Sequence, residues 1–265
     1  MSNGWDYTKD EFKKALENAG IGKGDIVFTH VGYAFLGKPK DCVNNEQVCQ
    51  MILDAFLEII GDNGTLLVPT YTYSFCENQD FDVNNSPSTI GPFTEFFKKQ
   101  KNALRSIEPI FSVSGIGPKT DELFTNLPST SFGKDSIYDR LIKNNGKICM
   151  IGIPLKYATF RHHIEEVANI PSRFIKKFSG NIIQNNKKYF QEWEYYVRHL
   201  NNDNCKPDGS KLENLIREQK LCNVIKVGRG EILTIDSKKY FDFGFNHLKK
   251  DPWLTSSGSS MKNIN

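Results

Sequence analysis

One short segment of the chain combines side chains that could move a proton. Residues 159–166 read TFRHHIEE, with two histidines followed by two glutamates. On a helix, His162 would lie beside Glu165 and Glu166, because positions three and four residues apart are neighbours on a helix surface. A carboxylate beside an imidazole fixes its tautomer and supports the imidazolium that forms on proton uptake. The pattern therefore predicts a general base at His162, which either glutamate could orient.

Two other interpretations of this segment stay open. Histidines on helices are often only hydrogen-bonded core or surface residues, and short motifs carry a large false-positive risk. A shared metal ion is disfavoured, because the adjacent His162 and His163 would point about 100° apart on a helix. The chain also has no H-E-x-x-H pattern and no C-x-x-C pair, both of which are common in zinc sites. We therefore expect no metal.

Motifs of other enzyme classes are missing. The sequence has no G-x-x-x-x-G-K-S/T and no G-x-S-x-G, so neither a P-loop enzyme nor a serine hydrolase is favoured. The glycines at 20, 22 and 24 precede a predicted strand, whereas a dinucleotide site would need them after one. The six cysteines are irregularly spaced, so free thiols in a reducing compartment are expected.

The elements that must position the histidines follow an alternating order. Residues 25–30 and 65–70 are typical of short buried strands, and residues 44–60 between them have apolar side chains at helical spacing. A strand, helix and strand in this order favour a parallel sheet. A further strand at 147–153 leads to a helix at about 159–169, at the strand end where open sheets place their sites. We predict an α/β fold with a central, mostly parallel sheet flanked by helices.

The pattern changes after Pro171. Two aromatic-rich alternating runs, 174–183 and 187–197, predict a β-hairpin around Asn185-Asn186. We expect an α/β core at 1–172, an added antiparallel β/α section at 173–255 packed on it, and a flexible tail at 256–265. Further elements are predicted as helices at 10–18, 88–99, 135–144, 211–220 and 236–247, and as strands at 110–113, 223–227 and 231–235.

Charge and hydropathy along the sequence disfavour nucleic-acid and membrane partners. The net charge is +3 in 265 residues, so no nucleic-acid partner is expected, since such proteins usually carry a basic stripe. No apolar run reaches the roughly 20 residues of a membrane helix, and the amino terminus has no secretory signal. A cytoplasmic protein without a membrane contact is therefore expected. The aromatic residues Trp193, Tyr195 and Tyr196 could cover a homodimer interface.

Five ordered stretches resemble the aminoglycoside 3-N-acetyltransferase family. They cover about residues 20 to 170, and the most specific is GIPLKYATFRHHIEEVANIP at 152–171, which is similar to a family segment with G-x-P-L and H-H-x-E. The resemblance implies transfer of an acyl group from coenzyme A to an amine. The other four stretches are IVFTH at 26–30, GTLLVPT at 64–70, SPSTIG with TEF at 86–96, and RSIEPIFS at 105–112.

The resemblance also implies roles for individual residues. His162 would be the catalytic base and Glu165 the glutamate of the same motif, while a hydroxyl such as that of Thr70 would stabilise the tetrahedral oxyanion. No acyl-enzyme is required. The residues expected near coenzyme A are His30, Val31, Gly32, Arg105 and Ser112.

Departures from the family pattern bear on the substrates. Antibiotic-modifying members usually carry two serines where Val31-Gly32 stands, and the small Gly32 would leave room for an acyl chain longer than acetyl. Aromatic residues suit stacking on a sugar or nucleobase, so Tyr71 and Tyr73 are expected to bind the acceptor, together with Glu108 and His163.

The stretches PTYTYSF and EPIFSVSGIG are more similar to relatives that N-acylate nucleotide-linked amino sugars for surface polysaccharides. The resemblance therefore favours a nucleotide-linked amino-deoxysugar of surface polysaccharide biosynthesis as the acceptor. Three alternatives stay open. They are an aminoglycoside acceptor, as in antibiotic resistance, a hydrolase such as a thioesterase on the same scaffold, and a relative that only binds a sugar nucleotide.

Overall fold

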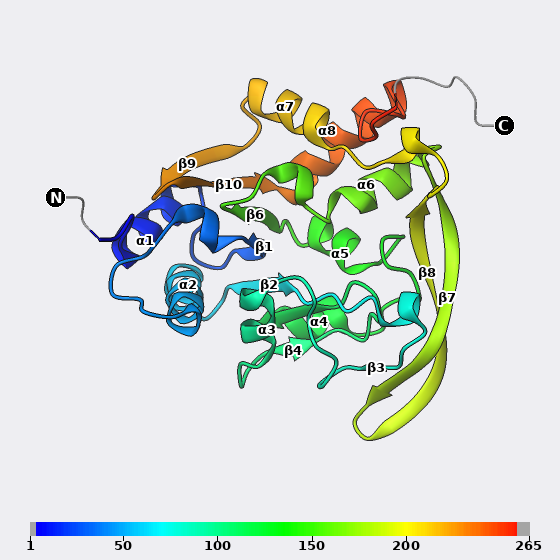
Figure 1. The fold of residues 1–265 in the computed structure, drawn as a ribbon, viewed down its shortest axis with the longest axis horizontal. Helices are drawn as coiled ribbons and strands as arrows, with labels where there is room; N and C mark the ends of the chain where they lie inside the picture. The colour runs from blue at the N-terminus through cyan, green and yellow to red at the C-terminus, as the bar shows by residue number, and fades with distance from the viewer. Residues whose placement is uncertain (1–3, 259–265) are drawn as a thin grey trace.

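A seven-stranded sheet forms the centre of the molecule (Figure 1). The structure is a computed structural model that describes residues 4–258. The strands of this sheet, in spatial order, are β4 (Leu104–Arg105), β5 (Val113–Ile116), β2 (Thr65–Pro69), β1 (Ile26–Val31), β6 (Lys147–Ile151), β10 (Gly230–Asp236) and β9 (Asn223–Val227).

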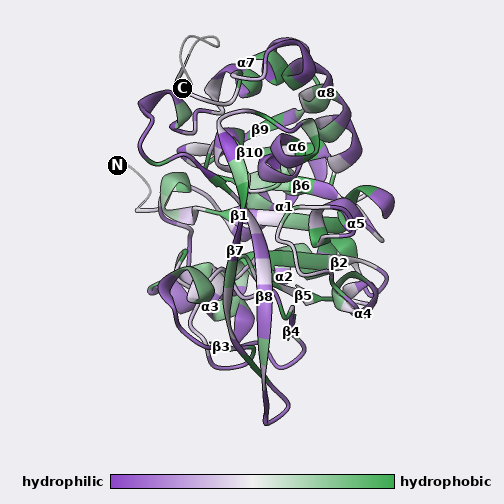
Figure 2. Ribbon diagram, turned by 90° about the vertical axis from the view of Figure 1, so that its right-hand side faces the viewer, coloured by the Kyte–Doolittle hydropathy of each residue, from purple (hydrophilic) through white to green (hydrophobic). Residues whose placement is uncertain are grey.

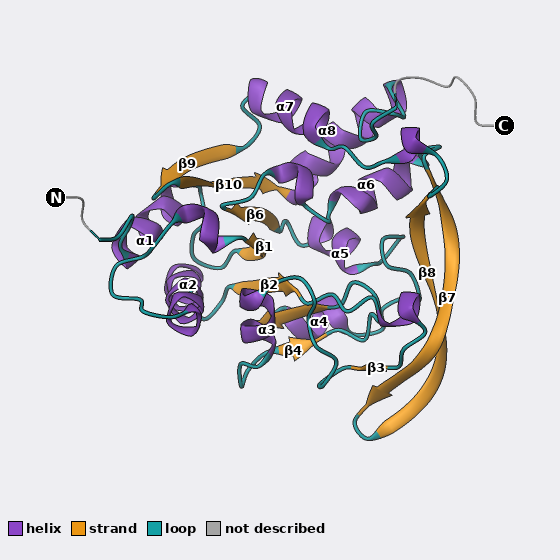
Figure 3. Ribbon diagram, viewed as in Figure 1, coloured by secondary structure: helices purple, strands orange, loops and turns teal. Residues whose placement is uncertain are grey.

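Eight α-helices and four short 3-10 helices surround the strands within residues 4–258 (Figure 3). The α-helices are α1 (Lys9–Asn18), α2 (Asn45–Ile60), α3 (Pro92–Lys98), α4 (Thr120–Phe124), α5 (Ile137–Lys143), α6 (Arg161–Ala168), α7 (Ser210–Glu218) and α8 (Ser237–Lys250). The 3-10 helices are η1 (Tyr33–Leu36), η2 (Ser74–Glu77), η3 (Leu155–Tyr157) and η4 (Asp203–Cys205).

The predicted strand–helix–strand unit is confirmed as β1, α2 and β2. β1 pairs in parallel with both β2 and β6, and these three strands are buried almost throughout. β5 and β10 are antiparallel to their neighbours, and β4 and β9 are antiparallel to these in turn. Five of the seven strands therefore point the same way, and the α/β class with a mostly parallel sheet is confirmed.

The two faces of the sheet bury different helices. Alternate side chains of a strand point to opposite faces, so Val27 faces the core with α1, α2 and α3, whereas Phe28 faces the core with α5, α6, α7 and α8. α1 begins with the predicted capping box, in which Thr8 accepts from the Glu11 backbone and Glu11 accepts from that of Thr8. Such caps stabilise a helix start by about 1 kcal/mol.

A second sheet contains the predicted hairpin. β7 (Arg173–Gln184) and β8 (Lys187–Arg198) pair along their whole length, and β3 (Phe81–Asp82) joins β7 in parallel. Asn185 and Asn186 both have positive φ, 50° and 59°, which asparagine tolerates in tight hairpin turns. The hairpin runs along one side of the molecule (Figure 1), and Figure 2 shows it facing the viewer with hydrophilic and hydrophobic residues interspersed along its strands.

Some expectations about local structure were wrong. The strand predicted at 110–113 lies instead at Val113–Ile116, because the backbone N–H groups of Ile110 and Phe111 donate to the Glu108 carboxylate and not to a neighbouring strand. Residues 71–87, for which no helix or strand is predicted above, contain η2 and β3.

Of the three hairpin aromatics expected at a homodimer interface, two are buried within the chain and Tyr195 is half-buried. Trp193 and Tyr196 are buried in the core of the same chain, and Tyr196 donates from its hydroxyl to the Ile170 carbonyl. Of the expected tail, Ser256 is buried and bonded to Ser172, while residues 259–265 lie outside the described range. Among residues 4–258, no helix is both long and apolar enough to cross a membrane.

Candidate active site

The two-histidine segment forms the first part of α6. The helix begins at Arg161, after β6 and η3, and ends at Asn169, which adopts φ 55° and returns its N–H to the last turn. Thr159, just before the helix, donates its backbone N–H to Nε2 of His30 on β1 (3.3 Å). The start of α6 is thereby tied to the carboxyl end of a central strand, the edge at which open sheets bind ligands.

His162 and Glu165 form a hydrogen-bonded pair. Nδ1 of His162 lies 2.7 Å from Oε2 of Glu165. An ionised carboxylate only accepts, so Nδ1 carries the proton and Nε2 keeps its lone pair. No hydrogen bond to Nε2 occurs among residues 4–258. The sequence left open which glutamate orients His162, and the geometry selects Glu165.

Two arginines complete what we call the His162 cluster, which consists of His162, Glu165, Arg161 and Arg173. Nε of Arg173, the first residue of β7, lies 2.9 Å from Oε2 of Glu165. Nε of Arg161 lies 3.3 Å from the other oxygen, Oε1. The side chains of both arginines and of Glu165 are almost completely buried. Buried charges persist only when they are paired in this way.

The charges of the cluster determine its protonation. Burial alone would raise the pKa of Glu165, but Arg161, Arg173 and His162 outweigh it and hold that pKa well below its ordinary value. Burial, followed by the positive charge of Arg173, lowers the pKa of His162 to about 4, and Glu165 opposes this only in part. At neutral pH the cluster therefore holds a carboxylate and a neutral imidazole.

A groove of about 1090 Å³ opens onto His162. Its wall is formed mainly by the hairpin and by the segment that follows β8. Such a volume is at the upper end of the roughly 300–1,000 Å³ typical of small-molecule sites. The groove is lined by Cys76, His162, Arg173, Phe174, Lys176, Phe178, Tyr195, Val197, Arg198, His199, Leu200, Asn201, Asn202, Asp203 and Pro207.

The charges on the groove wall are mostly positive. Lys176 and Arg198 have no ion-pair partner among the described residues, and Nζ of Lys176 lies 4.8 Å above the Phe178 ring. The only carboxylate in the lining, Asp203, pairs with Lys206 at 2.7 Å. The groove therefore offers unpaired cations next to a neutral base.

His163 and Glu166 face away from this groove. His163 is buried and its Nδ1 donates to the Phe132 carbonyl at 2.6 Å, so the structure does not bring it to the predicted acceptor site. Glu166 lies near Glu194. Burial, and then the charge of Glu194, raises the pKa of Glu166 to about 7.

Two expected ligand residues, His30 and Tyr71, make buried polar contacts, and a third, Tyr73, packs beside Tyr71. The hydroxyls of Tyr71 and Tyr138 lie 3.0 Å apart, and Nε2 of His30 lies 3.2 Å from the Thr159 hydroxyl. Tyr73 packs its ring against Tyr71 and Phe111. Burial lowers the pKa of His30 to about 3. None of the three expected residues, His30, Tyr71 and Tyr73, is in the lining of the groove.

Val31 and Gly32 end β1 beside β6. The Gly32 N–H donates to the Ile151 carbonyl at 2.8 Å. A Cβ on Gly32 would lie 2.5 Å from Cγ2 of Ile153, so an existing side chain fills the space that the glycine leaves. At Gly32 itself the structure leaves no open space, and an acyl chain longer than acetyl stays a prediction.

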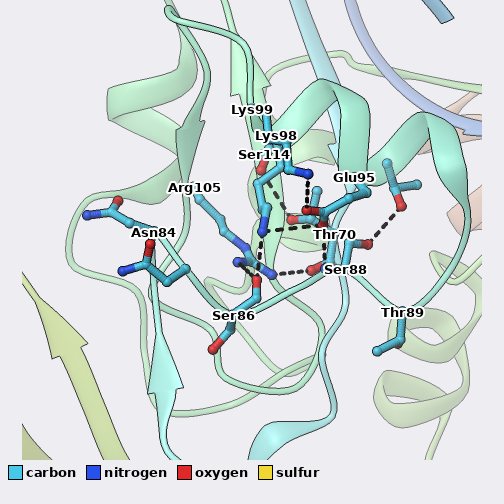
Figure 4. Close-up of polar contacts among 12 residues, drawn as sticks. Thr70, Asn84, Ser86, Ser88, Thr89, Glu95, Lys98, Lys99, Arg105 and Ser114 are labelled. Atoms are coloured by element: carbon cyan, nitrogen blue, oxygen red, sulfur yellow. Dashed lines mark hydrogen bonds and ion pairs between the residues drawn. The ribbon is translucent and has the colours of Figure 1, made fainter. Parts of the chain in front are cut away.

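The remaining expected cofactor residues, Arg105 and Ser112, belong to a second cluster, the Arg105 cluster, which also contains Thr70, Ser86, Lys98 and Glu95. Figure 4 shows Arg105 beside Thr70, Ser86, Lys98 and Glu95. Arg105 donates to the carbonyls of Thr70 and Ser86, each at 2.6 Å. The Ser112 hydroxyl donates to the Thr70 carbonyl at 2.7 Å. Lys98 also donates to the Ser86 carbonyl, at 2.9 Å. These side chains hold loop segments together.

Thr70 and Glu108 are likewise engaged within the fold. The Thr70 hydroxyl donates to the Ser112 carbonyl at 3.1 Å and is fully buried, so its single proton is not aimed at the groove. Glu108 accepts from the Ser131 hydroxyl at 2.6 Å and from two backbone N–H groups. Burial raises the pKa of Glu108 to about 7, and these donors oppose the shift.

Sequence reasoning missed the two arginines of the His162 cluster. Arg161 precedes Glu165 by four residues, a spacing that brings side chains together on a helix and could have revealed it. Arg173 lies in a different element, and no sequence signal links it to Glu165.

Comparison with known proteins agrees with this geometry. Residues 39–249 match the family model described as aminoglycoside 3-N-acetyltransferase. The chain belongs to the aminoglycoside 3-N-acetyltransferase family. It is thus an acyltransferase, as the sequence resemblance implied, and the family match disfavours the hydrolase and binding-only alternatives.

Individual relatives are distant in sequence and close in fold. Aminoglycoside N(3)-acetyltransferase IX from Micromonospora chalcea is 25% identical over 211 residues, which are 72% of this chain and 73% of the relative. The crystal structure of aminoglycoside acetyltransferase AAC(3)-Xa superposes with a TM-score of 0.79, at 21% identity over 92% of this chain and 93% of the other.

A second solved relative bears on the co-substrate. AAC-IIIb in its binary complex with CoASH superposes with a TM-score of 0.78, at 21% identity over 96% of this chain and 99% of the other. Coenzyme A, the co-substrate that the sequence resemblance implied, is thus bound by a relative of the same fold. The names of these relatives support the aminoglycoside alternative better than a nucleotide-linked sugar.

Proposed function

We propose that this chain transfers an acetyl group from acetyl-coenzyme A to an amine of an aminoglycoside, with His162 as the general base. The observation that carries the proposal is the free Nε2 of His162, which belongs to a groove-lining residue whose other nitrogen is fixed by Glu165 at 2.7 Å. A neutral imidazole with one free lone pair is the form that can take a proton from an attacking amine.

The reaction needs one base and no covalent enzyme intermediate. The acceptor nitrogen attacks the thioester carbonyl, so that a C–N bond forms and the C–S bond breaks with its electron pair going to sulfur. Nε2 of His162 takes the proton that the nitrogen loses. Glu165 holds the ring in the tautomer that leaves Nε2 unprotonated and stabilises the imidazolium while it exists.

The groove fits a large anionic co-substrate. Coenzyme A carries phosphate groups, and Lys176 and Arg198 line the groove without ion-pair partners. Arginine and lysine are the usual partners of phosphate. The side chains of Phe174 and Phe178 add apolar surface to the same wall. These residues are therefore our candidates for contact with coenzyme A. They replace Arg105 and Ser112, whose polar groups already make hydrogen bonds within the fold.

The aminoglycoside acceptor is supported by the family match and by the name of the Micromonospora relative. A second candidate, a nucleotide-linked amino sugar, is favoured by one observation. Aminoglycosides are polycations, yet the groove lining holds Lys176 and Arg198 as unpaired cations and only Asp203 as a carboxylate. A phosphate-bearing acceptor would match that charge.

An acceptor panel tests the proposal. Purified protein is mixed with acetyl-coenzyme A and single amines, and the released thiol and the acetylated product are both measured. The panel holds several aminoglycosides and several nucleotide-linked amino-deoxysugars, with amine-free mixtures as the control. We expect stoichiometric thiol release and acetylated product with aminoglycosides.

The other outcomes are equally informative. Product formed only from nucleotide-linked sugars would replace the first candidate by the second. Thiol release without an amine would identify a thioesterase and overturn both.

A further inference from the structure

A single carboxylate oxygen serves two partners in the His162 cluster. Oε2 of Glu165 lies 2.7 Å from Nδ1 of His162 and 2.9 Å from Nε of Arg173. A dyad built only to strengthen a base would leave the carboxylate to the imidazole. Here a buried guanidinium lies against the same oxygen as an ion-pair partner, and it lines the groove together with His162.

The hairpin fixes the position of Arg173 beside Glu165. It is the first residue of β7, and a second nitrogen of its guanidinium donates to the Tyr196 carbonyl on β8 at 3.0 Å. The hairpin thus holds the arginine through both of its strands. Arg161 differs, because its Nε lies farther from the carboxylate, 3.3 Å from Oε1, and because it does not line the groove.

Within residues 4–258, Glu165 is the only carboxylate that makes an ion pair or a hydrogen bond with His162. With the imidazole neutral, Glu165 and the two arginines carry one net positive charge, and a proton on His162 adds a second. Titratable and charged groups from α6, η2, β7, β8 and the segment after β8 face His162 or line the groove with it. These groups are Arg161, Glu165, Cys76, Arg173, Lys176, Tyr195, Arg198, His199 and Asp203.

We propose that Arg173 is a positioning residue that shares the Glu165 carboxylate with His162, so that the imidazolium is short-lived and returns its proton to the departing coenzyme A thiolate. The proposal rests on the acyl transfer described above. The proton moves from the acceptor nitrogen to Nε2 of His162 and then to the sulfur atom, which leaves with the electron pair of the C–S bond. His162 ends each turnover neutral, and no other reactant is needed.

The positive charge of Arg173 disfavours a second positive charge on the nearby His162 ring. A positive guanidinium beside the carboxylate offsets the negative charge that would otherwise stabilise an imidazolium. The lowered pKa of His162, about 4, agrees with this arrangement, since burial and then Arg173 are its first two causes. A weakly basic imidazole has a strongly acidic conjugate imidazolium. Rapid proton donation from that imidazolium helps the thiolate to leave.

The test follows the protonation of His162 directly. The histidine rings are labelled with carbon-13, His162 is assigned through His162→Gln, and its signal is followed from pH 4 to pH 8 in the native protein and in Arg173→Gln. Arg173→Lys keeps a charge with fewer donors. Arg229→Gln is the matched control, because Arg229 is 74% exposed and pairs with Asp6 on another part of the surface.

We expect the His162 ring of the native protein to stay neutral down to about pH 5, and Arg173→Gln to raise its proton affinity tenfold or more, which is about one pH unit. Arg173→Lys should give a smaller rise, and Arg229→Gln none. In the acyl-transfer assay, Arg173→Gln should gain an acidic limb in the pH profile of kcat/KM, and its kcat should fall roughly tenfold as proton return slows.

Two results would overturn the proposal. One is a native His162 that titrates near its ordinary value, and the other is an unchanged His162 titration in folded Arg173→Gln or, where that variant does not fold, in Arg173→Lys. The titration needs no acceptor and no turnover, so it stands even when the proposed acyl transfer fails.

Discussion

The His162 cluster and the Arg105 cluster both gather buried and half-buried charged side chains near the central sheet, yet their hydrogen bonds end differently. In the Arg105 cluster every donor of Arg105 ends on a backbone carbonyl or on Ser112. In the His162 cluster, Nδ1 of His162 is hydrogen-bonded to Glu165, but Nε2 has no hydrogen-bond partner among the described residues. The ring of His162 lines the groove.

This difference separates a structural role from a chemical one. A side chain whose hydrogen-bonding capacity is used within the fold stabilises it and has little left for a ligand. A free, oriented lone pair on a groove wall can take part in a reaction. Both clusters were singled out by ordered sequence motifs, so the motifs alone could not distinguish them.

The largest effect is expected from removing the centre of the His162 cluster. Glu165→Ala leaves Arg161 and Arg173 buried without a counter-charge, which costs about 3–5 kcal/mol of unfolding free energy. Urea denaturation measures this. Glu165→Gln keeps the volume and should cost less stability, while acyl transfer per folded molecule still falls roughly 100-fold or more. Full activity in Glu165→Gln would contradict the assigned pairing.

Breaking the Arg105 cluster should affect stability alone. Arg105→Met leaves several loop carbonyls without donors, at a cost on the order of 2–4 kcal/mol, while kcat and KM per folded molecule stay unchanged. Arg140→Met is the matched control, because Arg140 donates to the carbonyls of Asp135, Thr125 and Asn126 among others. A raised KM for acetyl-coenzyme A in Arg105→Met only would restore the cofactor role that the sequence implied.

The two clusters should also differ in their response to pH. In unfolded chains histidine binds a proton near pH 6.5, but folded His162 does so only near pH 4. Between these values the unfolded state binds more protons, so the contribution of neutral His162 is complete above about pH 6.5 and is lost as the pH falls towards 4.

Denaturation at pH 7 and pH 5 measures this difference. The stability deficit of His162→Gln relative to the native protein should narrow by up to about 1.4 kcal/mol per pH unit over that range. The deficit of Arg105→Met should change much less, since carbonyls do not titrate and the charge of Arg105 is only the last of the influences on the pKa of Glu108. A constant deficit in both variants would show that His162 is not held neutral by the fold.

The smallest effect concerns the cations of the groove. Lys176→Gln and Arg198→Gln should each raise KM for acetyl-coenzyme A about twofold to fivefold, because an exposed ion pair contributes at most about 1 kcal/mol. KM for a polycationic acceptor should fall in the same variants, and KM for a phosphate-bearing acceptor should rise. No change for any substrate would remove both residues from the binding surface.

Much of the fold was accessible from local sequence signals. The apolar repeat of α2, the Thr8 capping box and the asparagine turn of the hairpin each depend on neighbouring residues, and all are present. The shift of β5 escaped detection because it depends on Glu108 occupying the backbone N–H groups before that strand.

The site could be predicted from the sequence only in part, because many of its contacts also join residues that are distant in the sequence. The pairing of His162 with Glu165 follows from helical spacing within one segment. The competition from Arg173, the burial of His163 against the Phe132 carbonyl and the engagement of Thr70 with Ser112 all join residues from separate elements. Such partners are determined by packing and are not visible in a residue pattern.

The most direct test of the central claim is the acyl-transfer rate of His162→Ala at saturating acetyl-coenzyme A and acceptor, beside that of His199→Ala. His199 also lines the groove but packs its ring on Phe174, outside the His162 cluster. We predict that His162→Ala loses about 10²–10⁴-fold in kcat while it remains folded, and that His199→Ala keeps most of its activity. An equally small loss in both variants would contradict the assignment of His162 as the general base.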